Sequence, residues 1–94
     1  MTYRAEVFVT LKPVVNDPAG LTIKGGLHAL GFDSVNDVRA GKYLVVTLDA
    51  EDEGEARSQV EAMTQQLLAN AVIEDYRVEL QAVAEPSTAG QRPA

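Results

Sequence analysis

Two adjacent acidic residues have the most obvious capacity for chemistry in this sequence. Glu74 and Asp75 stand side by side, as paired carboxylates for acid–base catalysis would. Residues 72–83 alternate between polar and apolar types, however, and this alternation is typical of a strand. Neighbouring side chains on a strand point to opposite faces, so the two carboxylates cannot share a proton. We interpret them as charges of a solvated strand start or of a helix-end loop. The functional alternative is an intersubunit salt bridge with Arg39, Arg77 or Lys42.

The remaining reactive residues do not form a recognisable catalytic or metal-binding set. His28 is the single histidine, and the sequence has no cysteine with which it could complete a ligand set. The acidic run at residues 49–55 is too short for a calcium loop and suits the charged start of a helix. Gly41 and Lys42 lack the other residues of a phosphate loop and predict a hairpin turn. No nucleophile has an evident base beside it, so we expect no independent active site.

Composition narrows the class of protein further. The chain has 94 residues, which is the length of one domain, and a formal net charge of −6. Its basic residues are scattered singly, whereas a nucleic-acid binder usually has a basic stripe. No apolar run approaches the length of a membrane span. Charged Arg4 comes so early in the sequence that we expect no signal peptide. We expect a cytoplasmic protein that binds neither nucleic acid nor membrane.

The first half of the chain predicts a strand and a helix. Residues 3–11 alternate as a half-buried strand does, although Phe8 falls on the polar face. Asp17 and Pro18 predict a helix start, because Asp caps free N–H groups and Pro suits the first helical position. Gly31 is a natural left-handed residue for the helix end. One face of this helix is apolar and comprises Ile23, Leu27 and Leu30.

The second half predicts a hairpin, a helix and a final strand. Residues 34–39 form a weak strand pattern and residues 43–49 a stronger one, with a turn at residues 40–42. Asp52 and Glu55 have the spacing of a capping box. Asn70 is a candidate helix terminator. The apolar stripe of this second helix comprises Ala56, Val60, Met63 and Leu67.

The predicted order is therefore β-α-β-β-α-β in one domain, residues 1–83, followed by a disordered tail, residues 84–94. Residues 30–39 also echo residues 68–77, each with Asp and then Arg two positions later. Together these features predict an α+β fold, a two-layer ferredoxin-like antiparallel sheet with two helices on one face. The opposite face of the sheet would be open and would suit another subunit.

Several segments resemble the PurS family, the small accessory subunit of phosphoribosylformylglycinamidine synthase, also called formylglycinamide ribonucleotide amidotransferase. The most specific match is LLANAVIEDYRVEL at residues 67–80. The others, in family order, are LKPVVNDPAG at residues 11–20, LGF at residues 30–32 and DVRAGKY at residues 37–43. The resemblance spans residues 3–82 and agrees with the predicted order of elements.

The resemblance implies a role in purine biosynthesis within an ATP-dependent C–N ligase that takes nitrogen from glutamine. A glutaminase subunit would release ammonia, and a synthetase subunit would use ATP and magnesium. The PurS-like chain would carry neither active site nor cofactor. It would form a homodimer or a dimer of dimers, bridge the other two subunits and help ammonia to pass between them.

We predict that partner or dimer contacts involve charged residues at an interface rim, with an aromatic residue as an anchor. The candidates are Lys12, Asp17, Arg39, Lys42, Asn70, Glu74, Asp75 and Tyr76. Asp17 and Asn70 also suit purely structural capping roles. An alternative function is a small-molecule-binding regulatory domain, which would be stabilised by its ligand. A phosphatase of similar topology would need an arginine in its N-terminal phosphate loop, and residues 12–20 contain none.

Overall fold

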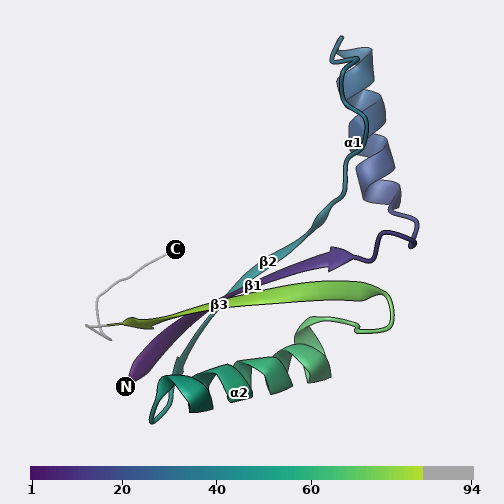
Figure 1. Ribbon diagram of the computed structural model, residues 1–94. Helices are drawn as coiled ribbons and strands as arrows, with labels where there is room; N and C mark the ends of the chain where they lie inside the picture. The colour runs from purple at the N-terminus through teal and green to yellow at the C-terminus, as the bar shows by residue number, and fades with distance from the viewer. Residues whose placement is uncertain (84–94) are drawn as a thin grey trace.

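The computed structural model describes residues 1–83, and the predicted tail, residues 84–94, lies outside the described residues (Figure 1). The elements in chain order are β1 (Thr2–Leu11), α1 (Pro18–Ala29), β2 (Gly41–Asp49), α2 (Glu53–Met63), a π-helical turn η1 (Thr64–Leu68) and β3 (Glu74–Val83). In this part of the chain no helix is long and apolar enough to cross a bilayer. The predicted α+β class with an antiparallel sheet and two helices is confirmed.

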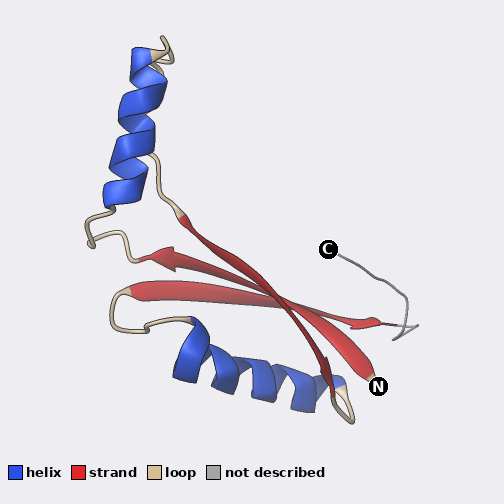
Figure 2. Ribbon diagram, turned by 180° about the vertical axis from the view of Figure 1, so that it is seen from behind, coloured by secondary structure: helices blue, strands red, loops and turns tan. Residues whose placement is uncertain are grey.

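The sheet has three strands in the order β2-β1-β3, and both pairings are antiparallel. The central strand β1 shows the predicted alternation, with Ala5, Val7 and Val9 almost wholly buried. These side chains pack against Val60 of α2, which lies along one face of the sheet (Figure 2). Strand periodicity therefore places the core on one face, and Phe8 lies on the other face as predicted.

The start of helix α2 is stabilised by two local hydrogen bonds between side chains and backbone N–H groups. Its first turn is capped because the Asp52 carboxylate accepts a hydrogen bond from the Glu55 N–H at 2.8 Å, as the spacing predicted. The Glu55 carboxylate reaches back to the Glu51 N–H at 2.6 Å, one residue before the cap. These contacts occupy backbone donors that a helix start would otherwise leave unpaired.

The apolar stripe predicted for α2 holds for most of its length and fails at Leu67. Ala56 and Val60 are fully buried, whereas 83% of the Leu67 side chain is exposed. The π-helical turn η1 adds a residue to the last helical turn, so the stripe shifts in register. Thr64 takes the buried position instead, and its hydroxyl donates to the Val60 carbonyl at 2.7 Å.

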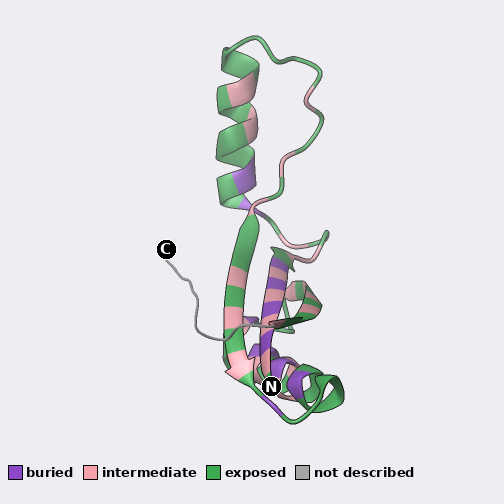
Figure 3. Ribbon diagram, turned by 90° about the vertical axis from the view of Figure 1, so that its left-hand side faces the viewer, coloured by how far each residue is buried: buried purple, intermediate pink, exposed green. Residues whose placement is uncertain are grey.

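The prediction of a strand at residues 34–39 is wrong. These residues run without a strand partner, and Gly41 begins β2 directly opposite Thr10 where a hairpin turn was expected. Helix α1 also differs from the expected arrangement, because it stands apart from the sheet and has at most a marginal contact with any other element (Figure 1). Almost all of α1 is exposed except at its base (Figure 3).

The result is an elongated molecule of 49 × 30 × 18 Å with a radius of gyration of 17.0 Å. A compact domain of this length would have a radius of gyration of about 12 Å. We call residues 18–40, which comprise α1 and the segment that returns from it to β2, the arm. Within residues 1–83 only α2 covers the sheet, so the core of this part of the chain is built by one helix and three strands.

This small core should be sensitive to loss of volume at its centre. Val60→Ala removes buried methyl groups from α2, which packs on the sheet, and we expect the free energy of unfolding to fall by about 2 kcal/mol. Urea denaturation monitored by circular dichroism measures the change. The matched control is Val72→Ala, because Val72 is 81% exposed. Equal losses in the two variants would contradict this account of the core.

Candidate interaction site

The structure brings all eight predicted contact residues to one end of the sheet, where β1 ends and β2 and β3 begin. Lys12 directly follows β1, and Asp17 caps α1. Arg39 and Lys42 flank the start of β2. Asn70, Glu74, Asp75 and Tyr76 surround the start of β3. Residues that are far apart in sequence therefore form one cluster at this end of the sheet, next to the base of the arm.

Asp17 contacts both ends of the arm. One carboxylate oxygen accepts a hydrogen bond from the Gly20 N–H at 2.9 Å and so caps α1, as predicted. The other oxygen accepts from the Ala40 N–H at 2.8 Å, on the chain segment that returns from the arm. The Asp17 side chain thus joins both ends of the arm to each other.

Arg39 reinforces this junction from the outside. Its guanidinium donates to the backbone carbonyls of Lys12 at 2.9 Å and Val15 at 2.8 Å. Its Nε lies 4.0 Å from the Asp17 carboxylate. We call these contacts between residues 12–17 and residues 38–41 the neck. Because they cross-link two chain segments with several hydrogen bonds, the neck restrains the direction in which the arm leaves the sheet.

Burial and hydrogen bonding act on Asp17 in opposite directions. The residue is only 3% exposed, and burial raises its pKa. The Gly20 and Ala40 N–H groups outweigh burial and hold the pKa of Asp17 below its ordinary value, and the charge of Arg39 contributes in the same sense. The helix start also passes very close to the returning segment, because a Cβ at Gly20 would lie 2.1 Å from the Val38 carbonyl oxygen.

The two lysines of the cluster bind within the chain. Lys12 Nζ contacts the Asp75 carboxylate at 3.0 Å, and Lys42 Nζ donates to the Leu68 carbonyl at 2.9 Å at the end of η1. The Lys12–Asp75 pair is exposed to solvent, and such surface pairs contribute little to stability. The two lysine contacts instead fix the positions of chain segments. Lys12 connects the end of β1 to the start of β3, and Lys42 connects β2 to the end of η1.

The turn between η1 and β3 uses Asn70 and Glu74. The helical segment ends at Leu68 with Ala69 as its extended cap, so Asn70 does not terminate it as predicted. Asn70 instead forms the following turn, because its side-chain oxygen accepts from Val72 N–H at 3.0 Å. The Glu74 carboxylate accepts from the Asn70 N–H at 2.7 Å.

Tyr76 lies on the core face of β3 and is half-buried. Its hydroxyl donates to the Glu61 carboxylate at 2.6 Å and accepts from Gln65 Nε2 at 3.2 Å. The hydrogen bond to Glu61 raises the pKa of Tyr76. The cluster is therefore engaged within the chain at every position, and a partner-binding role for its members stays a prediction.

The open face of the sheet carries an aromatic group whose full extent sequence reasoning missed. Phe8 stacks at a tilt against Tyr43 with ring centroids 5.2 Å apart, and the Arg77 guanidinium lies 4.1 Å above the Phe8 ring. The Tyr43 hydroxyl donates to Glu6, which raises the pKa of Tyr43. Phe8 faces both Tyr43 and Arg77 in the strand register, so a correct strand alignment would have revealed this row.

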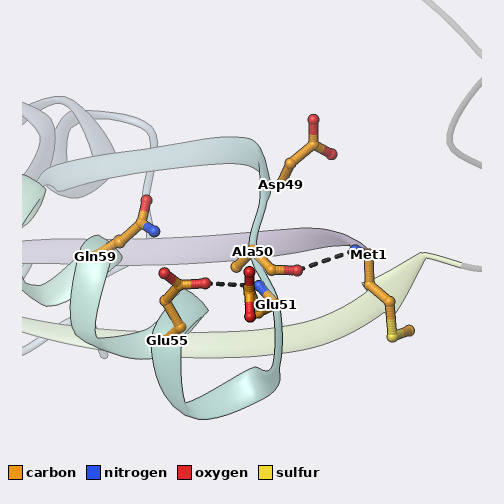
Figure 4. A pocket seen from close by; sticks show the side chains of 6 residues that line it. All are labelled: Met1, Asp49, Ala50, Glu51, Glu55 and Gln59. Atoms are coloured by element: carbon orange, nitrogen blue, oxygen red, sulfur yellow. Dashed lines mark hydrogen bonds between the residues drawn. The ribbon is translucent and has the colours of Figure 1, made fainter.

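An acidic hollow lies at the opposite end of the sheet (Figure 4). It is lined by Met1, Asp49, Ala50, Glu51, Glu55 and Gln59. The N-terminal ammonium donates to the Ala50 carbonyl at 3.0 Å, and the Glu55 carboxylate accepts from the Glu51 N–H. Within residues 1–83 no group of acidic, histidine or cysteine side chains is arranged to hold a metal ion. The hydrogen bond between Met1 and Ala50 connects the start of β1 to the loop before α2.

Comparison with known proteins decides the family. The PurS family profile, described as phosphoribosylformylglycinamidine (FGAM) synthase, matches residues 4–82. The chain belongs to the PurS family. A PurS subunit of this synthase from Synechocystis is 49% identical over 82 residues, which are 87% of this chain and 82% of the relative. The Bacillus subtilis PurS subunit is 42% identical over 86% of this chain and 95% of its own.

Solved PurS structures share the fold. Bacillus subtilis PurS superposes with a TM-score of 0.77 at 41% identity, covering 85% of this chain and 99% of that one. A Thermotoga maritima structure named PurLQS superposes with a TM-score of 0.79 at 28% identity, covering 86% and 99%. The predicted family and its link to phosphoribosylformylglycinamidine synthase are therefore confirmed. The PurS chain from Methanocaldococcus jannaschii is described as one of the subunits of this enzyme in the purine biosynthetic pathway.

The neck of this PurS-family chain should make stability depend on pH through Asp17. Because its pKa is lowered in the folded state, ionised Asp17 stabilises the fold above its unfolded pKa of about 4, and this stability is lost as pH falls through the folded value. Asp17→Asn can still cap Gly20, but its amide group cannot accept from both N–H donors. We expect a lower urea midpoint at neutral pH and a shallower loss of stability as the pH falls below about 4.

The control for this measurement is Asp33→Asn, since Asp33 is exposed beyond the end of α1. It should keep both the midpoint and the acid slope of the parent chain. Parallel stability curves for Asp17→Asn and the parent across this pH range would show that the neck carboxylate does not act as described.

Proposed function

We propose that this chain is a non-catalytic bridging subunit of phosphoribosylformylglycinamidine synthase, docking a glutaminase subunit to an ATP-dependent synthetase subunit. The observation that carries the proposal is membership of the PurS family together with the likeness to the Thermotoga maritima PurLQS structure over 86% of the chain. In this proposal ATP and magnesium bind to the synthetase, and this chain holds no cofactor. The complex works in the cytoplasm.

The chemistry of ammonia explains why such a subunit would be needed. Ammonia released from glutamine is largely protonated at neutral pH, and the ammonium ion is not a nucleophile. The two catalytic subunits must therefore be held in a fixed relative position so that ammonia passes between them before it is protonated. A subunit that fixes this position needs rigidity and surface, and it needs no reactive side chain of its own.

The shape of the chain supports a bridging role. The arm extends from the sheet at the neck, which holds its base through Asp17 and Arg39. The open sheet face adds a row of half-buried Phe8 and exposed Tyr43 and Arg77, of a composition that is enriched at interfaces. The arm and the open sheet face are separate surfaces of one chain, which suits a protein that contacts more than one partner.

The proposed unit of assembly is a homodimer, or a pair of such dimers. A domain of this length buries only about 60–65% of the surface that its unfolded chain exposes, so association contributes strongly to its stability. The exposed apolar side chains of α1 and its C-cap, among them Ile23 at 46% and Leu30 at 76%, are consistent with a surface that is covered in the assembly.

Reconstitution tests the bridging function. The purified chain is mixed with the glutaminase and synthetase subunits from the same organism, and product is measured with glutamine as the nitrogen donor. We expect product to form with all three chains and to fall at least tenfold when this chain is left out. With ammonium salt in place of glutamine, the synthetase should keep its activity in either mixture, because free ammonia bypasses the need for docking.

The ammonium assay is the internal control for the integrity of the synthetase. If glutamine-dependent product forms equally well without this chain, the bridging function fails. If leaving out the chain also abolishes ammonium-dependent activity, the chain acts on the synthetase chemistry itself and the proposed division of labour is wrong.

A further inference from the structure

A pocket of about 390 Å³ lies beside the neck, where β1 ends and β3 begins. Small-molecule sites in proteins typically have volumes of about 300–1,000 Å³, so this pocket has room for a small ligand. Its lining combines two carboxylates, a guanidinium, a hydroxyl and two apolar side chains, namely Asp37, Asp75, Arg39, Thr10, Leu11 and Pro13. We call it the neck pocket. The proposed bridging function assigns no ligand to it.

The walls of the neck pocket are held in place by contacts within the chain. Thr10 and Asp75 are direct partners in the antiparallel pairing of β1 with β3, so both side chains lie on the same face of the sheet. Arg39 is fixed by its hydrogen bonds to the Lys12 and Val15 carbonyls. A preformed pocket loses little side-chain freedom when a ligand enters, and this favours binding.

One side of the neck pocket offers hydrogen-bond acceptors. The Asp37 carboxylate has no hydrogen bond or ion pair within residues 1–83. Lys12 Nζ contacts Oδ1 of Asp75, and Oδ2 has no partner in the same part of the chain. The Thr10 hydroxyl is unpaired there as well. These acceptors suit an ammonium group, which has N–H donors for all of them.

The other side of the neck pocket offers hydrogen-bond donors from Arg39. Its Nη2 donates to both backbone carbonyls of the neck, and its Nε lies 4.0 Å from the Asp17 carboxylate. Its Nη1 has no protein partner within the described residues, so its N–H groups can bind a ligand. A guanidinium binds carboxylates through charge-assisted hydrogen bonds. The pocket therefore combines a cation-binding side with an anion-binding group.

We propose that the neck pocket binds a free α-amino acid. The ammonium group of the ligand lies among Asp37, Asp75 and Thr10, and its carboxylate accepts hydrogen bonds from Arg39 Nη1. This ligand-binding role goes beyond the bridging function and does not depend on it.

The charges of the lining favour a zwitterion over a simple ion. A simple anion bound to Arg39 would share the pocket with the carboxylates of Asp37 and Asp75, and a simple cation bound to those carboxylates would share it with the guanidinium. Like charges in one site repel each other, whereas an α-amino acid brings an opposite charge to each side. Leu11 and Pro13 add an apolar wall that suits an aliphatic side chain.

Nuclear magnetic resonance of the whole chain tests the class of ligand with matched probes. L-valine carries both charges, 3-methylbutanoate lacks its ammonium group, and 2-methylpropylamine lacks its carboxylate. Each probe is titrated into the ¹⁵N-labelled chain at constant pH and ionic strength. We expect L-valine to cause saturable shifts of the Thr10, Arg39 and Asp75 N–H signals, with a dissociation constant at least tenfold lower than that of either analogue.

A single substitution tests the position of the site. Asp37→Asn removes one charge from the ammonium side and breaks no contact within the described residues. It should weaken L-valine binding at least tenfold and leave the urea midpoint unchanged, because this carboxylate binds the ligand and does not support the fold. Asp33→Asn is the matched control, since Asp33 is exposed on the same returning segment and lies outside the lining of the pocket. It should bind L-valine like the parent.

The outcomes separate an amino-acid site from other sites and from the bridging function. Equal affinity for L-valine and 2-methylpropylamine would mean a cation site, and equal affinity for L-valine and 3-methylbutanoate would mean an anion site; either result would overturn the proposal. Shifts that do not saturate, or an Asp37→Asn variant that binds L-valine like the parent, would overturn it too. The reconstitution assay contains no L-valine and reports on bridging in every case.

Discussion

The position of the arm relative to the sheet depends on the hydrogen bonds that the buried Asp17 carboxylate accepts. A carboxylate that is only 3% exposed is tolerated because backbone N–H groups from two distant segments donate to it and a guanidinium lies nearby. One donor belongs to the start of α1 and the other to the entry of β2. The same group thus caps a helix and joins the two ends of the arm. Everything beyond the neck takes its direction from this contact.

A second constraint is the small size of the core. The fully buried side chains of the sheet are mostly valine and alanine, and in the described part of the chain α2 is the one helix that covers them. A chain that leaves its second helix exposed gives up a large part of the apolar burial that a two-helix layer provides. This deficit gives a physical reason for the proposed association of the chain. The apolar surface that stays uncovered lies on α1 and on the half-buried residues of β2.

The residues that resemble a binding surface in the sequence are engaged inside the chain. Lys12 pairs with Asp75, Lys42 binds the end of η1, and Tyr76 bonds to Glu61. They shape a rigid corner from which other surfaces project, and the aromatic row on the open sheet face is one of those surfaces. For a subunit whose proposed task is to hold two enzymes in position, such rigidity matters more than reactive chemistry.

Local signals in the sequence determined much of this protein, because strand alternation and helix caps involve neighbouring residues. The alternation of β1, the Asp17 cap, the left-handed Gly31 and the Asp52–Glu55 contact all follow from such signals. The family signature at residues 67–80 is also a property of the sequence alone. Tertiary structure decided the rest: the unpaired state of residues 34–39, the exposure of Leu67 after η1 and the position of α1 away from the sheet. A strand exists only when an edge is available to pair with it, and no local pattern encodes where that edge lies.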